Sequence, residues 1–225
     1  GVGYFKVNQR KGWRLTTARA FLRDAPRDRL KVETHAHATR ILLREGRAVG
    51  VEYLRDGALR SAHARAEVIL SAGAVNSPQL LQLSGIGPGA HLRDHGIEVR
   101  ADRPGVGQNL QDHLEVYMQY ASKKPITLYR YWNLLGKAWV GAQWLFTRTG
   151  HGASNQFESC GFICSGEGVD YPDIQYHFLP LAVRYDGKAA ASGHGFQAHV
   201  GPMRSKSRGS VRLDSSDPEK PPVIH

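Results

Sequence analysis

Cysteine is scarce in this chain of 225 residues, which contains only Cys160 and Cys164. Two cysteines cannot form a disulfide framework, so the sequence argues against a small secreted disulfide-bonded scaffold and favours a reducing compartment. Apolar runs long enough to cross a bilayer as a helix are also lacking. Charged residues make up 22% of the chain, close to the ordinary fraction, which argues against general disorder.

Positive charge is spread unevenly along the chain. Residues 1–104 hold 18 Lys or Arg against 10 Asp or Glu, and residues 105–225 hold 12 against 10. The basic residues are dispersed and no motif of a nucleic-acid-binding fold accompanies them, so nucleic acid is not the expected partner. A non-catalytic basic module for nucleic acid or an anionic membrane remains an alternative, and steep loss of binding with added salt would identify it.

A β-rich segment occupies the front half of the sequence. Thr16 or Thr17 is expected to cap a short helix that runs to about residue 24 and is closed by Pro26. Asp56-Gly57 is typical of a tight turn between two antiparallel strands. Strands are predicted in this half at residues 31–34, 39–44, 48–53, 59–65 and 67–70.

The hydrophobic period changes after residue 73. Ser77 is expected to be the N-cap, and Pro78 the first residue, of a helix that continues through residue 83. A second short helix near residues 90–95 is expected to close at Gly96. The Gly/Pro-rich passage at residues 104–107 is the predicted domain boundary. Further strands are predicted at residues 114–121, 157–164, 173–179, 195–200 and 209–213.

An aromatic helix is predicted over residues 131–146. Its apolar stripe consists of Trp132, Leu135, Trp139, Ala142 and Phe146. The stripe has two interpretations, a core-facing helix that covers a pocket or a helix that lies on a membrane surface. The few basic residues near it favour the first interpretation.

Sequence motifs for common active sites are absent. The G-x-G-x-x-G fingerprint and the G-x-S-x-G elbow do not occur. The junction from residues 68–70 through Ala72-Gly73-Ala74 into a helix presents free backbone N–H groups that suit phosphate or ribose oxygens, although many such junctions look alike. Cys160 and Cys164 share one face of a predicted strand and are interpreted as buried small residues, so no metal site is predicted.

Two longer segments resemble a known family. Residues 73–87 read GAVNSPQLLQLSGIG and match the second signature of the glucose–methanol–choline (GMC) flavin oxidoreductases at each constrained position. Residues 104–113 read PGVGQNLQDH, which is also a hallmark of that family. The chain is most similar to the choline-oxidising branch, on residues 111–115, 152–158, 173–180 and 195–205.

The resemblance implies a mixed α+β and α/β fold in two parts. Residues 1–113 are expected to form part of a Rossmann-like FAD-binding domain with a β-meander, and residues 114–225 part of an antiparallel-sheet substrate domain with covering helices. The chain would be the middle of a longer enzyme and would lack both the N-terminal FAD-binding loop and the C-terminal catalytic pair. We therefore expect the isolated chain to be inactive, with at most weak FAD affinity.

The implied activity is FAD-dependent oxidation of choline to betaine aldehyde, by hydride transfer to the flavin and removal of the hydroxyl proton by a base. Another primary alcohol is the nearest alternative substrate. The expected location is the cytoplasm or the inner-membrane surface as a peripheral protein, and not the outside of the cell.

Individual site residues follow from the same resemblance. Glu115 matches a glutamate that faces the trimethylammonium group, Phe157 an aromatic side chain of the substrate cage, and His177 a histidine that binds the substrate hydroxyl and assists proton removal. A quaternary ammonium cannot donate a strong hydrogen bond, so a carboxylate and aromatic faces suit it. The residues matched to FAD contacts are Ala38, Ala72, Gly73, Ala74, Asn109, Asp112 and His113.

Overall fold

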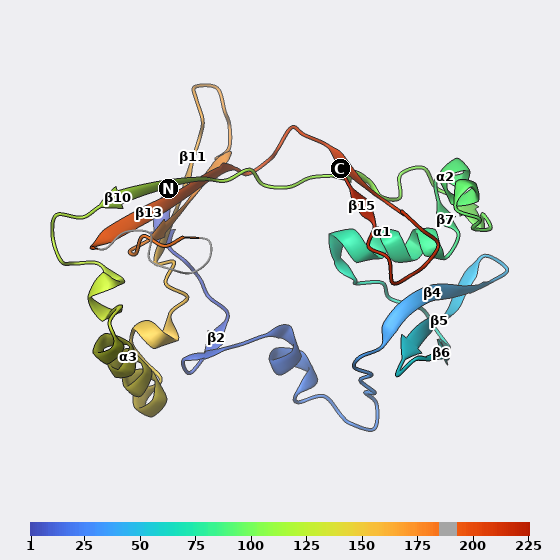
Figure 1. Cartoon of the computed structure of the whole chain (residues 1–225), viewed down its shortest axis with the longest axis horizontal. Coiled ribbons are helices and arrows are strands. Elements are labelled where there is room, and N and C mark those ends of the chain that lie inside the picture. The colour runs from blue at the N-terminus through green and yellow to red at the C-terminus, as the bar shows by residue number, and fades with distance from the viewer. Residues whose placement is uncertain (185–192) are drawn as a thin grey trace. The chain divides into compact units, whose positions relative to one another are not determined.

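The structure is a computed structural model, and it describes residues 1–184 and 193–225 (Figure 1). The chain divides into two units, each built from two separate segments. Unit 1 comprises Gly1–Leu30 and His113–Ser205, and unit 2 comprises Lys31–Asp112 and Lys206–His225. The predicted single boundary after residue 113 falls within one residue of one junction, but two further junctions follow residues 30 and 205. The predicted mixture of helices and antiparallel sheets is confirmed.

Unit 1 is organised around a five-stranded antiparallel sheet with the order β1-β11-β12-β13-β10. Its strands are β1 (Val2–Tyr4), β10 (Val116–Ala121), β11 (Ser159–Ile163), β12 (Ile174–Leu179) and β13 (Gly195–Pro202). The four strands predicted within residues 114–200 are therefore confirmed. The edge strand β1 pairs with β11, which comes much later in the sequence. Gly3 of β1 lies opposite Cys160 of β11.

The remaining elements of unit 1 are short, apart from one helix. They are the hairpin β2 (Gln9–Arg10) and β3 (Trp13–Arg14), a π-helical turn at Ala18–Leu22, 3₁₀ turns at Leu128–Tyr131 and His151–Ala153, and helix α3 (Leu134–Thr147). Arg19 donates its backbone N–H to Thr16 Oγ1 over 3.3 Å, so Thr16 serves as the predicted cap. Among the described residues, no helix has the length and apolarity that a membrane crossing requires.

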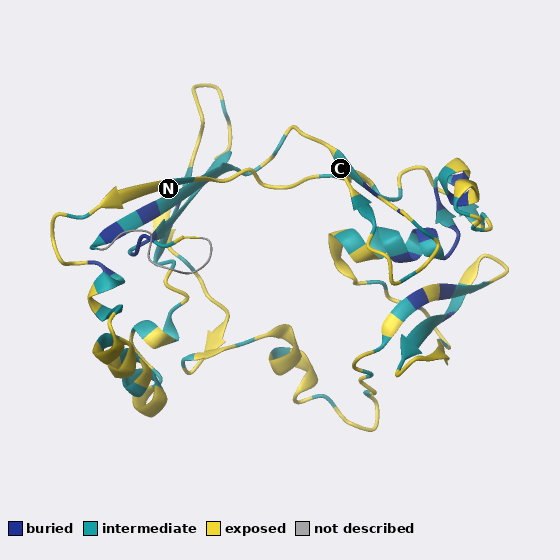
Figure 2. Ribbon diagram, viewed as in Figure 1, coloured by how far each residue is buried: buried dark blue, intermediate teal, exposed yellow. Residues whose placement is uncertain are grey.

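Helix α3 begins at Leu134, where Asn133 Oδ1 accepts a hydrogen bond from Gly136 N over 2.7 Å. The predicted core-facing stripe is wrong, since Leu135 and Phe146 are each 82% exposed. Figure 2 shows exposed residues along most of this helix. Apolar side chains lie on nearly every face of α3, so its pattern does not specify which face packs.

A different face of α3 packs inside unit 1. Trp144 donates its indole N–H to the backbone oxygen of Gly12 over 2.8 Å, and its ring meets that of Trp13 edge-on at 4.8 Å. The guanidinium of Arg148 lies 4.5 Å from the Trp144 ring centroid and 4.6 Å from that of Trp13. Helix α3 is thereby attached to the β2–β3 hairpin.

Unit 2 opens with the antiparallel meander β4 (His37–Arg44), β5 (Arg47–Arg55) and β6 (Ala58–His63). Asp56 and Gly57 connect β5 to β6 with φ angles of 53° and 73°, as a two-residue hairpin turn requires. Strands predicted at residues 31–34 and 67–70 do not form. Neither segment pairs with another strand in the part of the chain that the structure describes, and a segment without a pairing partner forms no sheet.

The other elements of unit 2 surround one helix. They are α1 (Gly73–Leu83), β7 (Ile86–Gly87), α2 (Gly89–Asp94), β8 (Ala101–Asp102), β9 (Gln108–Leu110), β14 (Gly209–Arg212) and β15 (Val223–Ile224). Strands β15, β14 and β9 form a sheet in that order, and β7 pairs with β8 in parallel. Helix α1 packs against both β4 and β14. The predicted short helix closing at Gly96 is confirmed by α2 and by the φ angle of 70° at this glycine.

Helix α1 starts four residues before the predicted N-cap, and the prediction that Ser77 and Pro78 open the helix is wrong. Ser77 Oγ instead accepts a hydrogen bond from Ala72 N over 3.1 Å, which supports a turn that precedes Pro78. Pro78 therefore lies inside the helix.

Two polar side chains, Gln82 in α1 and Ser84 at its C-cap, connect this helix to the strands that pack against it. Gln82 is fully buried, donates from Nε2 to the backbone oxygens of Pro78 and Val211 over 3.1 Å, and accepts from Leu213 N over 3.4 Å. Ser84 Oγ accepts from Ile41 N over 2.8 Å and so ties the helix to β4. These buried bonds hold the helix between a strand on each side.

Candidate substrate pocket

One face of the unit 1 sheet gathers the polar and aromatic groups of the candidate site. Strands alternate their side chains, so Tyr117 and Gln119 of β10 share a face. The register places His199 of β13 opposite both Tyr117 and His177, and Gln197 opposite Gln119. The same alternation predicts the shared face once the register is known.

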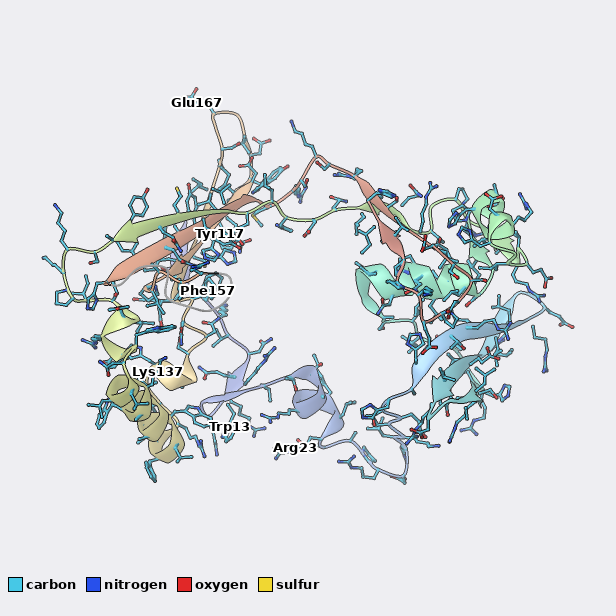
Figure 3. The ribbon with its side chains drawn as sticks, viewed as in Figure 1. Trp13, Arg23, Tyr117, Lys137, Phe157 and Glu167 are labelled. Atoms are coloured by element: carbon cyan, nitrogen blue, oxygen red, sulfur yellow. The ribbon has the colours of Figure 1, made fainter. Side chains whose placement is uncertain are left out.

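The three residues matched to substrate binding meet around His199. Glu115 precedes β10, and its Oε1 lies 3.3 Å from His199 Nδ1. Phe157 precedes β11, and its ring is perpendicular to those of His199 and His177, with centroids 5.5 and 6.1 Å away. Tyr117, labelled with Phe157 in Figure 3, meets the His199 ring edge-on at 4.2 Å.

Two cavities open on this face of the sheet. The larger has a volume of about 720 Å³, and its wall includes Tyr117, Trp132, Phe157, Gln197 and His199. The smaller has a volume of about 190 Å³ and is lined by His113, Leu114, Glu115, Gln175, His177 and Gly201. The contact between Glu115 and His199 joins a residue of one wall to a residue of the other. A cation near this contact would meet a carboxylate and several aromatic rings.

Burial is the main reason that the pKa of His199 lies below its ordinary value. The nearby carboxylate of Glu115 opposes this shift, and positive charge on His177 adds to it. His199 therefore favours its neutral form, while Glu115 remains the acidic group beside it.

The residues matched to the cofactor are distributed over both units. Ala38 lies in β4, Ala72, Gly73 and Ala74 lie at the start of α1, Asn109 lies in β9, and Asp112 ends the first segment of unit 2. His113 is the first residue of the second segment of unit 1 and lines the smaller cavity. Within unit 2, the packing of α1 against β4 brings together the two elements that carry most of these residues.

The amino terminus of α1 has the donor set that a phosphate or ribose oxygen needs. No side chain caps it, and Ala72, Gly73 and Ala74 are exposed. A Cβ placed on Gly73 would meet no atom within 4 Å. The first helical turn therefore offers uncapped backbone N–H groups at exposed residues, although it starts at Gly73 and not at the predicted Ser77 cap.

The cysteines show no metal-binding arrangement. Cys160 is half-buried in β11, and Cys164 is exposed beyond the end of the strand, so its predicted burial is wrong. Within residues 1–184 and 193–225, no group of three or more His, Cys, Asp or Glu side chains is placed to hold a metal ion.

Sequence reasoning missed His199, Tyr117 and Gln197 as parts of the site. His199 and Gln197 lie in the segment that resembles the family, but no role was assigned to either. Their positions two residues apart on a predicted strand were the available signal, because such residues share a face.

A family model described as GMC oxidoreductase matches residues 1–115. The chain belongs to the GMC oxidoreductase family. Proteins called oxygen-dependent choline dehydrogenase are similar over the whole chain, with 58% identity in Brucella anthropi, 56% in Brucella ovis and 54% in Rhizobium johnstonii. The chain spans 41% of the length of each of these GMC relatives.

Solved GMC-type structures show the same architecture. Pyridoxine 4-oxidase from Mesorbium loti aligns with the whole chain and 41% of its own length, with a TM-score of 0.79 and 28% identity. Formate oxidase aligns with 83% of the chain and 38% of its own length, with a TM-score of 0.76 and 26% identity. The fold predicted from the two signature segments is therefore confirmed.

Proposed function

We propose that this chain is the central part of an FAD-dependent GMC enzyme that oxidises choline to betaine aldehyde. The proposal is supported by 58% identity to a choline dehydrogenase over all 225 residues. The observation that carries the substrate assignment is the position of Glu115 beside an aromatic cluster on one sheet face.

The cluster suits a quaternary ammonium group for electrostatic reasons. The trimethylammonium group has no N–H to donate, so a pocket must hold it through charge and aromatic faces. Glu115 supplies a negative charge, and its side chain retains 35% exposure. Phe157 and Tyr117 supply ring faces in the adjoining cavity, each worth on the order of 0.5–2 kcal/mol to a cation that they contact.

His177 is proposed to bind the substrate hydroxyl and to assist removal of its proton. Its side chain lines the same small cavity as Glu115 and lies opposite His199 in the sheet. A histidine is suited to this role because an unprotonated imidazole nitrogen can accept both a hydrogen bond and the proton from a hydroxyl group.

FAD is the proposed cofactor, and when bound it supplies the hydride acceptor. The exposed N–H groups at Gly73 and Ala74 fit its phosphate or ribose oxygens, and Ala38, Ala72, Asn109, Asp112 and His113 are the other proposed contacts. A formate oxidase from Aspergillus oryzae, which is 27% identical to this chain, has been solved in a study of the modification of its FAD.

The experiment replaces Glu115 by Gln in the full-length enzyme that contains this chain. Steady-state kinetics compare choline with its neutral carbon isostere, 3,3-dimethylbutan-1-ol. We expect KM for choline to rise at least tenfold, about 1.4 kcal/mol, with little change for the neutral alcohol.

Glu167→Gln is the matched control, because this substitution removes the same charge from an exposed residue in the loop between β11 and β12 (Figure 3). Equal effects of Glu115→Gln on both alcohols would reject the cation site. A greater catalytic efficiency of the unmodified enzyme with the neutral alcohol would favour another primary alcohol as the substrate.

A further inference from the structure

We propose that His199 is a positioning residue of the cation site, which donates a hydrogen bond from Nδ1 to Glu115 as a neutral imidazole and leaves the carboxylate charge available to the substrate. The inference rests on the proposed function and extends it from Glu115 to the group behind it. Its basis is a chain of hydrogen bonds whose directions the backbone fixes.

The donor and acceptor roles in this chain of hydrogen bonds are set first at Gln197, which is 3% exposed. Its Oε1 lies 3.0 Å from the backbone nitrogen of Val183, and a backbone N–H can only donate. Gln119 Nε2 donates to the same oxygen over 2.8 Å and also to the backbone oxygen of Val183. The Gln197 amide is therefore oriented with its oxygen toward Val183 and its NH₂ group toward His199.

That orientation determines which ring nitrogen of His199 carries the proton. Gln197 Nε2 lies 2.5 Å from His199 Nε2, and an amide NH₂ group can only donate. His199 Nε2 must accept this bond and so carries no proton. The proton of the neutral ring is left on Nδ1, which lies 3.3 Å from Glu115 Oε1.

A doubly protonated His199 would face the Gln197 amide with a second donor at the same short distance. The ring is also largely buried, with 11% of its side chain exposed. The ionisable groups around it are Glu115 just before β10, Tyr117 in β10 and His177 in β12, with Arg184 on the wall of the same cavity. The carboxylate of Glu115 lies beside Nδ1.

The neutral state has a direct consequence for substrate binding. An imidazolium would form an ion pair with Glu115 and cancel the charge that attracts a cation. A neutral Nδ1–H donor instead holds one carboxylate oxygen in place without neutralising it. Tyr117 and Phe157 meet the His199 ring edge-on and keep its plane fixed.

The test uses the full-length enzyme and the dissociation constant of tetramethylammonium, which carries the cation but has no hydroxyl to oxidise. His199→Leu removes the donor, and we expect it to raise this constant about tenfold. His199→Asn keeps an amide N–H at the Nδ1 position and is expected to restore most of the affinity. His63→Leu, at an exposed position in β6, is the control for loss of a histidine.

A second measurement needs no variant. Nitrogen-15 chemical shifts of the labelled histidine rings, with the ring of His199 assigned through its bonded backbone resonances, are expected to show a neutral ring protonated on Nδ1 near pH 7.5. A ring protonated on Nε2, or on both nitrogens, would overturn the inference even if every variant failed to fold.

The outcomes separate the two proposals. If Glu115→Gln weakens tetramethylammonium binding but His199→Leu changes it less than twofold, the role of His199 is rejected and the cation site stands. Equal weakening by His199→Leu and His199→Asn would show that the ring acts by packing, which also rejects the inference. No effect of Glu115→Gln would reject the cation site itself.

Discussion

Replacing Gln82 by Leu should destabilise unit 2 by about 2–6 kcal/mol. The two side chains are similar in size, so the change mainly removes the polar contacts. It leaves the oxygen of Val211 and the N–H of Leu213 without the partner that Gln82 provides, and both residues are at most 3% exposed. Each buried backbone group left without a hydrogen bond costs about 1–3 kcal/mol.

Hydrogen exchange at the backbone amides of residues 211–213 is the appropriate assay, because it reports the opening of unit 2 locally, whereas a global unfolding curve reports the whole chain. Exchange in the Gln82→Leu variant should be faster by the factor that corresponds to the lost free energy. The measurement also reports the N–H of Leu213, which donates to Gln82.

Gln79→Leu is the matched control on the same helix. Gln79 donates to the backbone oxygen of Lys220 over 2.8 Å, but this bond lies at the surface. Its loss should cost less than about 1 kcal/mol, since water can replace the partner. If the two variants differ by less than about 0.5 kcal/mol, the reasoning from buried hydrogen bonds is refuted.

Two other predictions concern backbone space and pH. Gly107→Ala should cost several kcal/mol, roughly as severe core changes do, because φ is 77° and the new Cβ would lie 2.1 Å from the oxygen of Val211. When both variants are compared by denaturant titration, Gly105→Ala should be nearly neutral, since its Cβ meets no atom within 4 Å; equal losses would contradict the steric argument. Burial lowers the pKa values of His91 and His199, so the unfolded chain takes up protons more readily than the folded one. The free energy of unfolding should be highest above about pH 6.5 and decrease as pH falls toward the lowered values; His91→Leu should flatten the curve, and an unchanged slope would count against this assignment.

Local patterns predicted much of the antiparallel structure. Alternating residues and the Asp56-Gly57 turn identify the meander because both signals depend on near neighbours in sequence. The short helix predicted after Thr16 or Thr17 forms as the π-helical turn Ala18–Leu22, and its cap was the local signal. Such features need no knowledge of the distant chain.

The signature at residues 73–87 predicted the family but not the role of each residue within the signature. Exposed Gly73 and Ala74 offer backbone donors, whereas Gln82 and Ser84 hold α1 against its neighbouring strands. Sequence similarity treats these positions alike. Only the packing of β4 and β14 on the helix separates a binding role from a structural one.

Predictions failed where a distant partner decides the outcome. Residues 68–70 are apolar, but a strand also needs a neighbour, and none of the described strands pairs with them. The packed face of α3 is chosen by Trp13, which lies about 130 residues earlier in the chain. His199 was missed for the same reason, because its contact with Glu115 depends on the pairing of β10 with β13.

The use of two separate segments in each unit bears on how the polypeptide is made. The edge strand β1 leaves the ribosome long before β11, and β9 must wait for β14 until residues 209–212 have been synthesised. Both sheets therefore expose unpaired edges while the intervening residues are synthesised, and such edges readily pair with other chains. Chaperone supply and slow synthesis should improve the yield of folded protein. A gene divided after residue 113 would encode a first half without β14 and β15 and a second half without β1, so the halves should be co-expressed rather than made singly.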